Sequence, residues 1–276
     1  MAKSSYLIMK VLGNILLYVS AALFIFPLYW MFTGAFKNQS SSVKIPPDWI
    51  PTKITLANFS NLINDGSIFY WLYNSGFVSV IATVGVVLIA SMAGYALTKR
   101  KFKGSEFFFS AVLIAMFIPR QITLVPLFTM MRDLGLVNNL ASAILPVLTI
   151  PFAVFMMKQF SESVPTELLE AGRIDGCSEI GLFFKLFFPI IKPAIGALAI
   201  FTFTYAWNDY LWQLIMLSDK TKMTINVGIS TLVSEYVANY GLQMAAASLG
   251  FIPVFIIFIS FQKYFVKGIT LGGVKG

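Results

Sequence analysis

The sequence predicts an all-α membrane protein with six transmembrane helices and with both termini in the cytoplasm. Three observations lead to this fold class. Hydrophobic residues make up 58% of the 276 positions and only 12% are charged, about half the charged share of ordinary soluble proteins. Apolar runs of bilayer-spanning length recur along the chain, since about 20 residues cross the hydrocarbon core. Finally, the positive charges gather in alternate connecting segments.

We expect the spans to form one transmembrane domain of residues 1–276. The first span follows Lys3 and Lys10, and its apolar run is too long for a cleaved signal sequence, so we interpret it as an uncleaved anchor. Ser, Pro, Asn and Asp make the segment before the second span a loop with short ordered pieces. Residues 232–243 have the pattern of an amphipathic interfacial helix. The predicted spans are residues 11–33, 72–98, 107–130, 140–160, 193–217 and 244–265.

The orientation follows from the Lys and Arg residues. Most of the 20 fall near the N-terminus, in residues 99–103, in residues 158–192 and in the tail after residue 262. Cytoplasmic loops carry an excess of Lys and Arg, so these segments are predicted to face the cytoplasm. The same rule accounts for the net charge of +8, and we expect no nucleic-acid partner.

The composition excludes several kinds of chemistry. The chain has no histidine, which excludes histidine acid–base catalysis and most zinc sites. Its one cysteine, Cys177, cannot form an internal disulfide. No G-x-x-x-x-G-K-[S/T] run is present to hold ATP phosphates. We therefore expect no catalytic residue, metal or cofactor in this chain.

A charged stretch, ELLEAGRIDGCSEI at 167–180, interrupts the apolar sequence. It lies in a cytoplasmic loop of residues 161–192, which we predict to be a helix–turn–helix outside the lipid. Ser163 is expected to cap the first helix and Pro165 to occupy its first turn. That helix is expected to run to Ile174.

The second half of the loop has its own signals. Asp175 and Gly176 predict a turn, with Gly176 free to take a positive φ. Ser178 is expected to cap a second helix that ends before Pro189.

The first helix of this loop has features of a contact surface. Ala171 and Gly172 leave room for another backbone or a protein to approach closely, while Glu167, Glu170 and Asp175 supply negative charge. The alternative is an ordinary solvated loop whose charges serve no partner.

A sequence motif favours the contact surface over the ordinary solvated loop. The run EAGRIDGCSEIGLFFKLFFP at 170–189 resembles the cytoplasmic loop of ATP-binding-cassette (ABC) importer permeases. The pattern is Glu-Ala-Ala, three residues, Gly, nine residues and Ile-x-Leu-Pro. Here glycine replaces the second alanine at 172, and Leu186 and Phe188 replace Ile and Leu. Each change keeps small size or apolar character.

Three further stretches, residues 118–146, 207–214 and 264–276, resemble maltose-type carbohydrate permeases of the second-subunit class. The resemblance implies a type I ABC importer permease fold. It also implies a function, as the permease subunit of an ATP-driven, binding-protein-dependent importer of carbohydrates such as oligosaccharides.

The resemblance implies a coupling helix seated in a cleft of the ATPase subunit. Glu170 would pair with a basic residue there, Ala171 and Gly172 would pack closely, Gly176 would form the turn and Pro189 would stop the second helix. The C-terminal tail, residues 266–276, would reach towards the interface between two ATPase subunits. The implied coupling residues are Glu170, Ala171, Gly172, Asp175, Gly176 and Pro189.

The implied partners are a second related permease, two ABC ATPase subunits, an extracytoplasmic sugar-binding protein and membrane lipid. ATP and Mg²⁺ would be bound by the ATPase subunits. The implied location is the cytoplasmic (inner) membrane of a bacterium or archaeon, crossed several times.

Polar residues inside spans are costly and should face a bundle interior or a watery cavity. Asp209 lies about 24 Å into the fifth span at helical rise, in the outer part of the membrane. Arg120 lies at a similar depth beside Pro119, which should break the third span, and we hypothesise an Arg120–Asp209 ion pair. The alternative is that such residues only hold helices together. The candidate substrate-path residues are Asn74, Arg120, Gln121, Trp207, Asn208, Asp209 and Tyr210.

Aromatic residues beside these polar groups suit a sugar. Tyr205, Trp207, Tyr210 and Trp212 surround Asn208 and Asp209, and one helical face cannot contain all four. Trp207 and Tyr210, three apart, are expected to share a helical face. Trp and Tyr also gather at membrane interfaces without any ligand, which is the alternative interpretation.

Two other functions remain as alternatives. An autonomous secondary transporter or channel would need coupling carboxylates deep in the spans, and Asp209 is the only acidic candidate. An intramembrane enzyme would need paired acids or a metal cluster, and the sequence predicts neither.

Overall fold

The computed structural model describes residues 2–100, 102–232 and 239–273, without the side chains of 2–5, 8 and 264–273. Within these ranges the chain is helical and has no strand. It divides into two compact units. One comprises Met1–Ile68 and Ile229–Phe251, and the other comprises Phe69–Gly228 and Ile252–Gly276.

The first unit contains the long helix α1 (Ala2–Ala35), the short helices α2 (Gln39–Ser42) and α3 (Ala57–Asp65), and the beginning of α15 (Tyr240–Gly273). The side-chain amide of Asn58 donates to the carbonyl oxygens of Ala35 and Lys37, both at 2.8 Å. This contact fixes α3 against the end of α1. The predicted loop with short ordered pieces is confirmed by α2 and α3.

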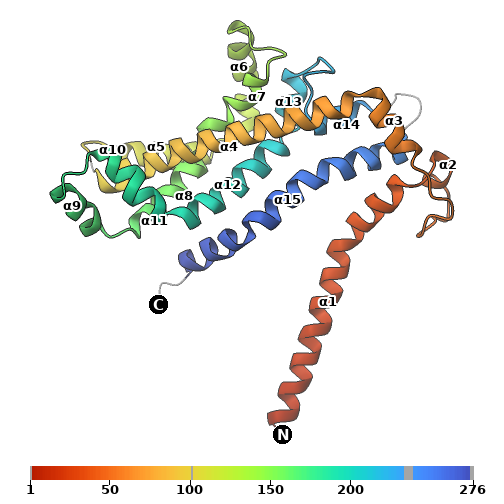
Figure 1. The fold of residues 1–276 in the computed structure, drawn as a ribbon, viewed down its shortest axis with the longest axis horizontal. Helices are drawn as coiled ribbons and strands as arrows, with labels where there is room; N and C mark the ends of the chain where they lie inside the picture. Colours follow the sequence, from red (N-terminus) through yellow and green to blue (C-terminus); the bar gives the residue numbers. More distant parts are fainter. Residues whose placement is uncertain (1, 101, 233–238, 274–276) are drawn as a thin grey trace. The chain divides into compact units, whose positions relative to one another are not determined.

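The second unit holds the remaining helices, shown in Figure 1. They are α4 (Ser67–Lys99), α5 (Ser105–Met116), α6 (Arg120–Asp133), α7 (Leu140–Ile144), the 3₁₀ turn η1 (Val147–Thr149), α8 (Pro151–Glu162), α9 (Thr166–Ile174), α10 (Glu179–Gly181), the π-helical segment η2 (Leu182–Phe187), α11 (Phe188–Ile190), α12 (Lys192–Trp207), α13 (Leu211–Met216) and α14 (Ile225–Thr231), whose last three residues belong to the first unit.

The core of the second unit lies among α4, α8, α12 and the segment from α9 to α11. Gly94 of α4 lies directly against the backbone of α8, because a Cβ at this position would be 2.8 Å from the carbonyl carbon of Met157. Helix α8 also packs on α5 and α12. The absence of a side chain at Gly94 therefore sets how closely α4 and α8 approach.

Three predicted spans lie in unbroken helices. Helices α1, α4 and α15 are long and apolar enough to cross a bilayer and contain the predicted spans 11–33, 72–98 and 244–265. Among the described residues the count of such helices is three, or up to six if each bent pair forms one span.

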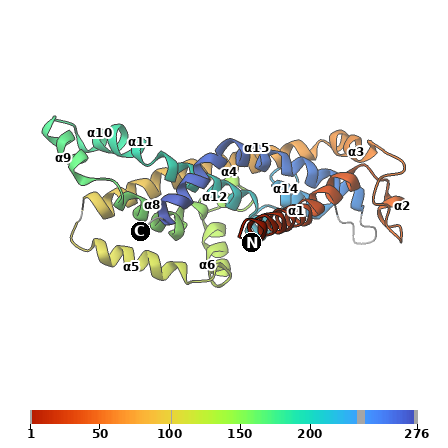
Figure 2. The same cartoon turned by 90° about the horizontal axis from the view of Figure 1, so that it is seen from below.

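The predicted span 107–130 is divided between two helices at the proline expected to break it. Helix α5 ends at Met116 and α6 begins at Arg120, with a bend of 102° between them that is plain in Figure 2. Pro119 has an extended backbone with ψ of 131° and lacks the N–H needed to continue a helix. The break predicted at this proline is therefore confirmed.

The other two predicted spans are also interrupted. Residues 140–160 bend by 43° between Thr149 and Pro151. Residues 193–217 are divided because α12 ends at Trp207 and α13 begins at Leu211. Instead, the helical run Glu179–Ile190 joins α12 through a bend of 80°.

The predicted C-terminal tail and the predicted interfacial helix are each described only in part. Helix α15 continues to Gly273, so the predicted tail 266–276 is helical as far as that residue. Residues 274–276, and residues 233–238 of the predicted interfacial helix, lie outside the described residues.

Candidate functional site

The loop of residues 161–192, which we call the docking loop, begins differently from the prediction. Helix α9 starts at Thr166, and Pro165 occupies the capping position with ψ of 132°. Ser163 belongs to the end of α8, where its hydroxyl donates to the carbonyl oxygen of Phe160 at 2.8 Å. The expectation that Ser163 caps the first helix is therefore wrong, because α8 extends two residues beyond the predicted span and uses this serine.

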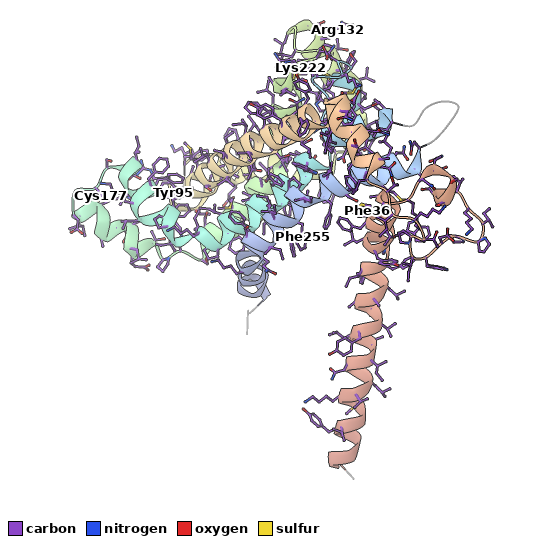
Figure 3. The ribbon with its side chains drawn as sticks, turned by 45° about the vertical axis from the view of Figure 1, so that its right-hand side comes forward. Phe36, Tyr95, Arg132, Cys177, Lys222 and Phe255 are labelled. Atoms are coloured by element: carbon purple, nitrogen blue, oxygen red, sulfur yellow. The ribbon has the colours of Figure 1, made fainter. Side chains whose placement is uncertain are left out.

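The turn after α9 agrees with the prediction. Gly176 has a φ of +80°, a conformation that glycine adopts without steric cost. The N–H of Cys177 donates to the carbonyl of Gly172 at 2.9 Å and the N–H of Gly176 donates to that of Arg173 at 3.0 Å. This pair of bonds is the Schellman pattern that closes a helix. The exposed thiol of Cys177 lies just after the turn (Figure 3).

The second helix of the docking loop starts as predicted and ends differently. The Ser178 hydroxyl accepts the N–H of Gly181 at 3.2 Å. Pro189, however, lies inside α11 and does not stop the helix. The π-helical segment η2 precedes it, and such widened turns accommodate a proline that lacks its N–H.

The inner face of α9 packs within the loop. Leu169 and Gly172 are buried, and a Cβ at position 172 would lie 2.6 Å from the side chains of Leu182 and Leu186. The small size of Gly172 therefore serves packing between the two helices of the loop. The close approach expected at Gly172 is therefore made by the second helix of its own loop.

The outer face of α9 and its turn is exposed. It presents Glu167, Glu170, Ala171 and Asp175. Beside these acidic and small residues, Ile174 is 87% exposed. This face therefore combines negative charge with one exposed apolar side chain.

Glu179 has contacts that the sequence did not predict. Its Oε1 accepts hydrogen bonds from Arg100 at 2.7 Å and Arg173 at 3.0 Å, and its Oε2 accepts one from the Tyr95 hydroxyl at 3.1 Å. The hydrogen bond from Arg173, together with that from Tyr95 and the nearby positive charges of Arg173 and Arg100, holds the pKa of the Glu179 carboxyl below its usual value. The only local signal was the spacing of Arg173 and Glu179 across the turn.

At the other end of α12, Arg120 and Asp209 form the hypothesised ion pair. The guanidinium Nη2 of Arg120 lies 3.1 Å from Oδ2 of Asp209, with the aspartate side chain 6% exposed and the arginine side chain half exposed. The Arg120 guanidinium carbon also lies 5.0 Å from the centre of the Tyr205 ring. Asp209 is held at the break between α12 and α13, where no helix continues.

This ion pair borders two cavities. The larger has a volume of about 740 Å³, and Gln121 lies in the smaller one of about 150 Å³. The larger cavity is lined by Arg120, Ile200, Phe201, Thr204, Tyr205, Asn208, Asp209, Tyr210, Leu211 and Phe258. Aromatic rings next to side-chain amide, carboxylate and guanidinium groups can hold a polyhydroxylated ligand. Tyr205 was among the aromatic residues expected near Asn208 and Asp209. Phe201 and Phe258 were not predicted, because spacing in α12 and α15 gives no sign that they meet.

Two predicted path residues lie elsewhere. Trp207 is 3% exposed and stacks on Phe203 within the core, so the expectation that it shares a face with Tyr210 is wrong; the helix ends between them. The Asn74 amide donates to the carbonyls of Thr221 and Met223, both at 2.9 Å. Asn74 therefore holds the loop that contains Thr221 and Met223 in place. This structural role agrees with the alternative that such polar residues only hold parts of the fold together.

The chain is similar to known transport proteins. Residues 85–271 match the protein family described as binding-protein-dependent transport system inner membrane component. The chain is 38% identical over 257 residues to the arabinooligosaccharides transport system permease protein AraQ of Bacillus subtilis (strain 168), covering 92% of each chain. It is 31% identical over 272 residues to the melibiose/raffinose/stachyose import permease protein MelC of the same strain, covering 97% of each.

The fold also has a solved relative. A chain of a bacterial ABC transporter involved in the import of the acidic polysaccharide alginate superposes with a TM-score of 0.84. The two are 22% identical, and the match covers 95% of this chain and 98% of that one. At this identity the likeness shows the fold.

Proposed function

Because the chain belongs to the family of binding-protein-dependent transport system inner membrane components, we propose that it is the permease subunit of an ATP-driven carbohydrate importer, with oligosaccharides as the substrate class. The observation that carries this proposal is the exposed outer face of α9 and its turn, which presents Glu170 and Asp175 together with Ile174. The names of the relatives support a sugar as substrate.

In this proposal the docking loop is the contact with an ABC ATPase subunit. Glu170 pairs with a basic residue in a cleft of that subunit, and the small Ala171 beside it allows close packing. Ile174 contributes the apolar contact. Asp175 and Gly176 shape the turn that follows. The ATPase subunits bind ATP and Mg²⁺, and this chain transmits their movement without catalytic residues of its own.

The cavity beside the Arg120–Asp209 pair is proposed as part of the sugar path. Tyr210 offers an aromatic ring to a sugar, Tyr205 lines the cavity beneath Arg120, and Asn208 offers an amide that both donates and accepts hydrogen bonds. Gln121 borders the smaller cavity on the other side of the ion pair. A second, related permease supplies the opposite half of the path, and an extracytoplasmic binding protein delivers the sugar.

The test is reconstitution of the complete importer in proteoliposomes, with the binding protein and a panel of oligosaccharides. We expect sugar uptake that depends on ATP and is lost in Glu170→Ala. The matched control is Glu106→Ala, which removes an exposed carboxylate from the first turn of α5 and should leave uptake unchanged.

Two results would refute the proposal. Uptake by this chain without an ATPase would favour a secondary transporter or channel. Unchanged uptake in Glu170→Ala would remove the coupling role of the docking loop.

A further inference from the structure

We propose that Glu179 is a positioning residue, which fastens the docking loop to the end of α4 so that the loop and this helix move as one body. The inference rests on the proposed function, because it concerns how force from an ATPase reaches the membrane helices. It goes further in naming the side chains that transmit this force inside the chain.

The geometry joins three separate parts of the second unit. Both oxygens of the Glu179 carboxylate are engaged, by Tyr95 near the end of α4, Arg100 just after α4, and Arg173 in the last turn of α9. Tyr95 and Arg100 lie 84 and 79 residues from Glu179 in the sequence. A single carboxylate therefore ties the turn of the docking loop to a helix that is distant in the sequence.

The hydroxyl of Tyr95 is held in place by apolar packing. The Tyr95 ring lies edge-on to Phe183 and Phe187, with centroids 5.5 and 4.9 Å away. Tyr95 is 7% exposed and Phe187 is fully buried. Since the ring cannot turn away without losing these contacts, its hydroxyl keeps one direction towards Glu179.

The charges of Arg173 and Glu179 are stabilised by the helix ends on which they lie. Arg173 is in the last turn of α9 and Glu179 is in the first turn of α10, where the helix dipoles favour a cation and an anion respectively. A lone exposed ion pair adds little. A carboxylate shared by two guanidinium groups and a buried hydroxyl is instead a network of charge-assisted bonds, which specifies one geometry.

A second tether lies at the start of the docking loop. The ammonium group of Lys99, the last residue of α4, donates to the carbonyl oxygen of Val164. Val164 itself is 3% exposed. Helix α9 is thus held to the end of α4 on both sides, before Thr166 and after Ile174. A displacement of α9 by a partner is therefore transmitted directly to α4.

The experiment uses the complete importer in proteoliposomes and measures ATP hydrolysed per sugar imported. Glu179→Gln should raise this ratio at least about fivefold, the low end of coupling effects between sites, and should speed amide hydrogen exchange at residues 172–177. The matched control, Asp133→Asn, removes an exposed 3.0 Å ion pair between Arg132 and Asp133 outside the docking loop and should change neither.

A double-mutant cycle separates positioning from general damage. If Arg100 acts through Glu179, then Arg100→Gln adds nothing to the ratio once Glu179→Gln is present. Additive effects would overturn the inference. Should the Glu179→Gln complex fail to assemble, Tyr95→Phe decides, because it removes only the hydroxyl and keeps the ring packing.

The outcomes for the two proposals differ. A wild-type complex that imports no carbohydrate contradicts the proposed function. A wild-type complex that imports normally, together with an unchanged ratio in assembled Glu179→Gln or in Tyr95→Phe, overturns the inference alone.

Discussion

The Arg120–Asp209 ion pair should respond asymmetrically to mutation. The Asp209 side chain is 6% exposed, whereas that of Arg120 is 50% exposed. Arg120→Leu leaves a buried carboxylate without its partner, a change that costs about 3–5 kcal/mol. Asp209→Asn leaves an arginine that reaches water and the Tyr205 ring, so its cost is about 0–1 kcal/mol, as for an exposed pair.

These energies convert into measurable shifts. For a chain of this size the midpoint of thermal unfolding falls by about 2–4 °C per kcal/mol. We therefore expect Arg120→Leu to lower the midpoint by about 6–20 °C and Asp209→Asn by at most about 4 °C. Replacing both residues by leucine should recover most of the loss, because two apolar side chains substitute well for a buried pair.

The assay is thermal unfolding of the purified complex in detergent, followed by tryptophan fluorescence. The control is Arg132→Leu, which breaks the pair with Asp133, whose two side chains are 58% and 63% exposed. Its effect should stay within about 0.5 kcal/mol. A midpoint for Asp209→Asn as low as that for Arg120→Leu would refute the burial argument.

Two further predictions concern packing and pH. Gly76→Ala should stabilise α4 by about 1 kcal/mol through helix propensity, since a Cβ there meets nothing within 4 Å. Gly94→Ala should destabilise by up to about 2 kcal/mol, because overpacking against Met157 exceeds that gain; equal unfolding midpoints for the two variants would contradict this. The lowered pKa of Glu179, caused chiefly by Arg173, means that its stabilisation is present above pH 4.5, its ordinary value, and disappears as pH falls through the lowered value. The stability difference between wild type and Glu179→Gln should therefore shrink below about pH 4.5, and a difference that grows in acid would reverse the sign of the argument.

Local backbone chemistry was the most predictable part of the site. The turn at Gly176 could be predicted because an Asp-Gly pair after a helix points to a residue with positive φ. The break at Pro119 followed from the missing N–H. The ion pair between Arg120 and Asp209 could be hypothesised because unpaired charges are costly in an apolar segment.

The errors arose where a local rule met a longer-range contact. Pro189 was expected to stop a helix, but the π-helical turns of η2 accommodate it. Gly172 was expected to admit another backbone or a protein, and the sequence did not reveal that its neighbours are two leucines of its own loop. The network around Glu179 depends on residues about 80 positions away. Its charged residues lie outside the predicted spans, where the cost of an unpaired charge gives no signal.

The position of Cys177 has a practical consequence. It is the only cysteine of the chain, and its thiol is exposed immediately after the turn at Gly176. A maleimide dye or spin label would therefore attach at one place on the native protein, at the tip of the docking loop, without any engineering. Fluorescence or spectroscopic distances from that label would follow the tip through each turnover.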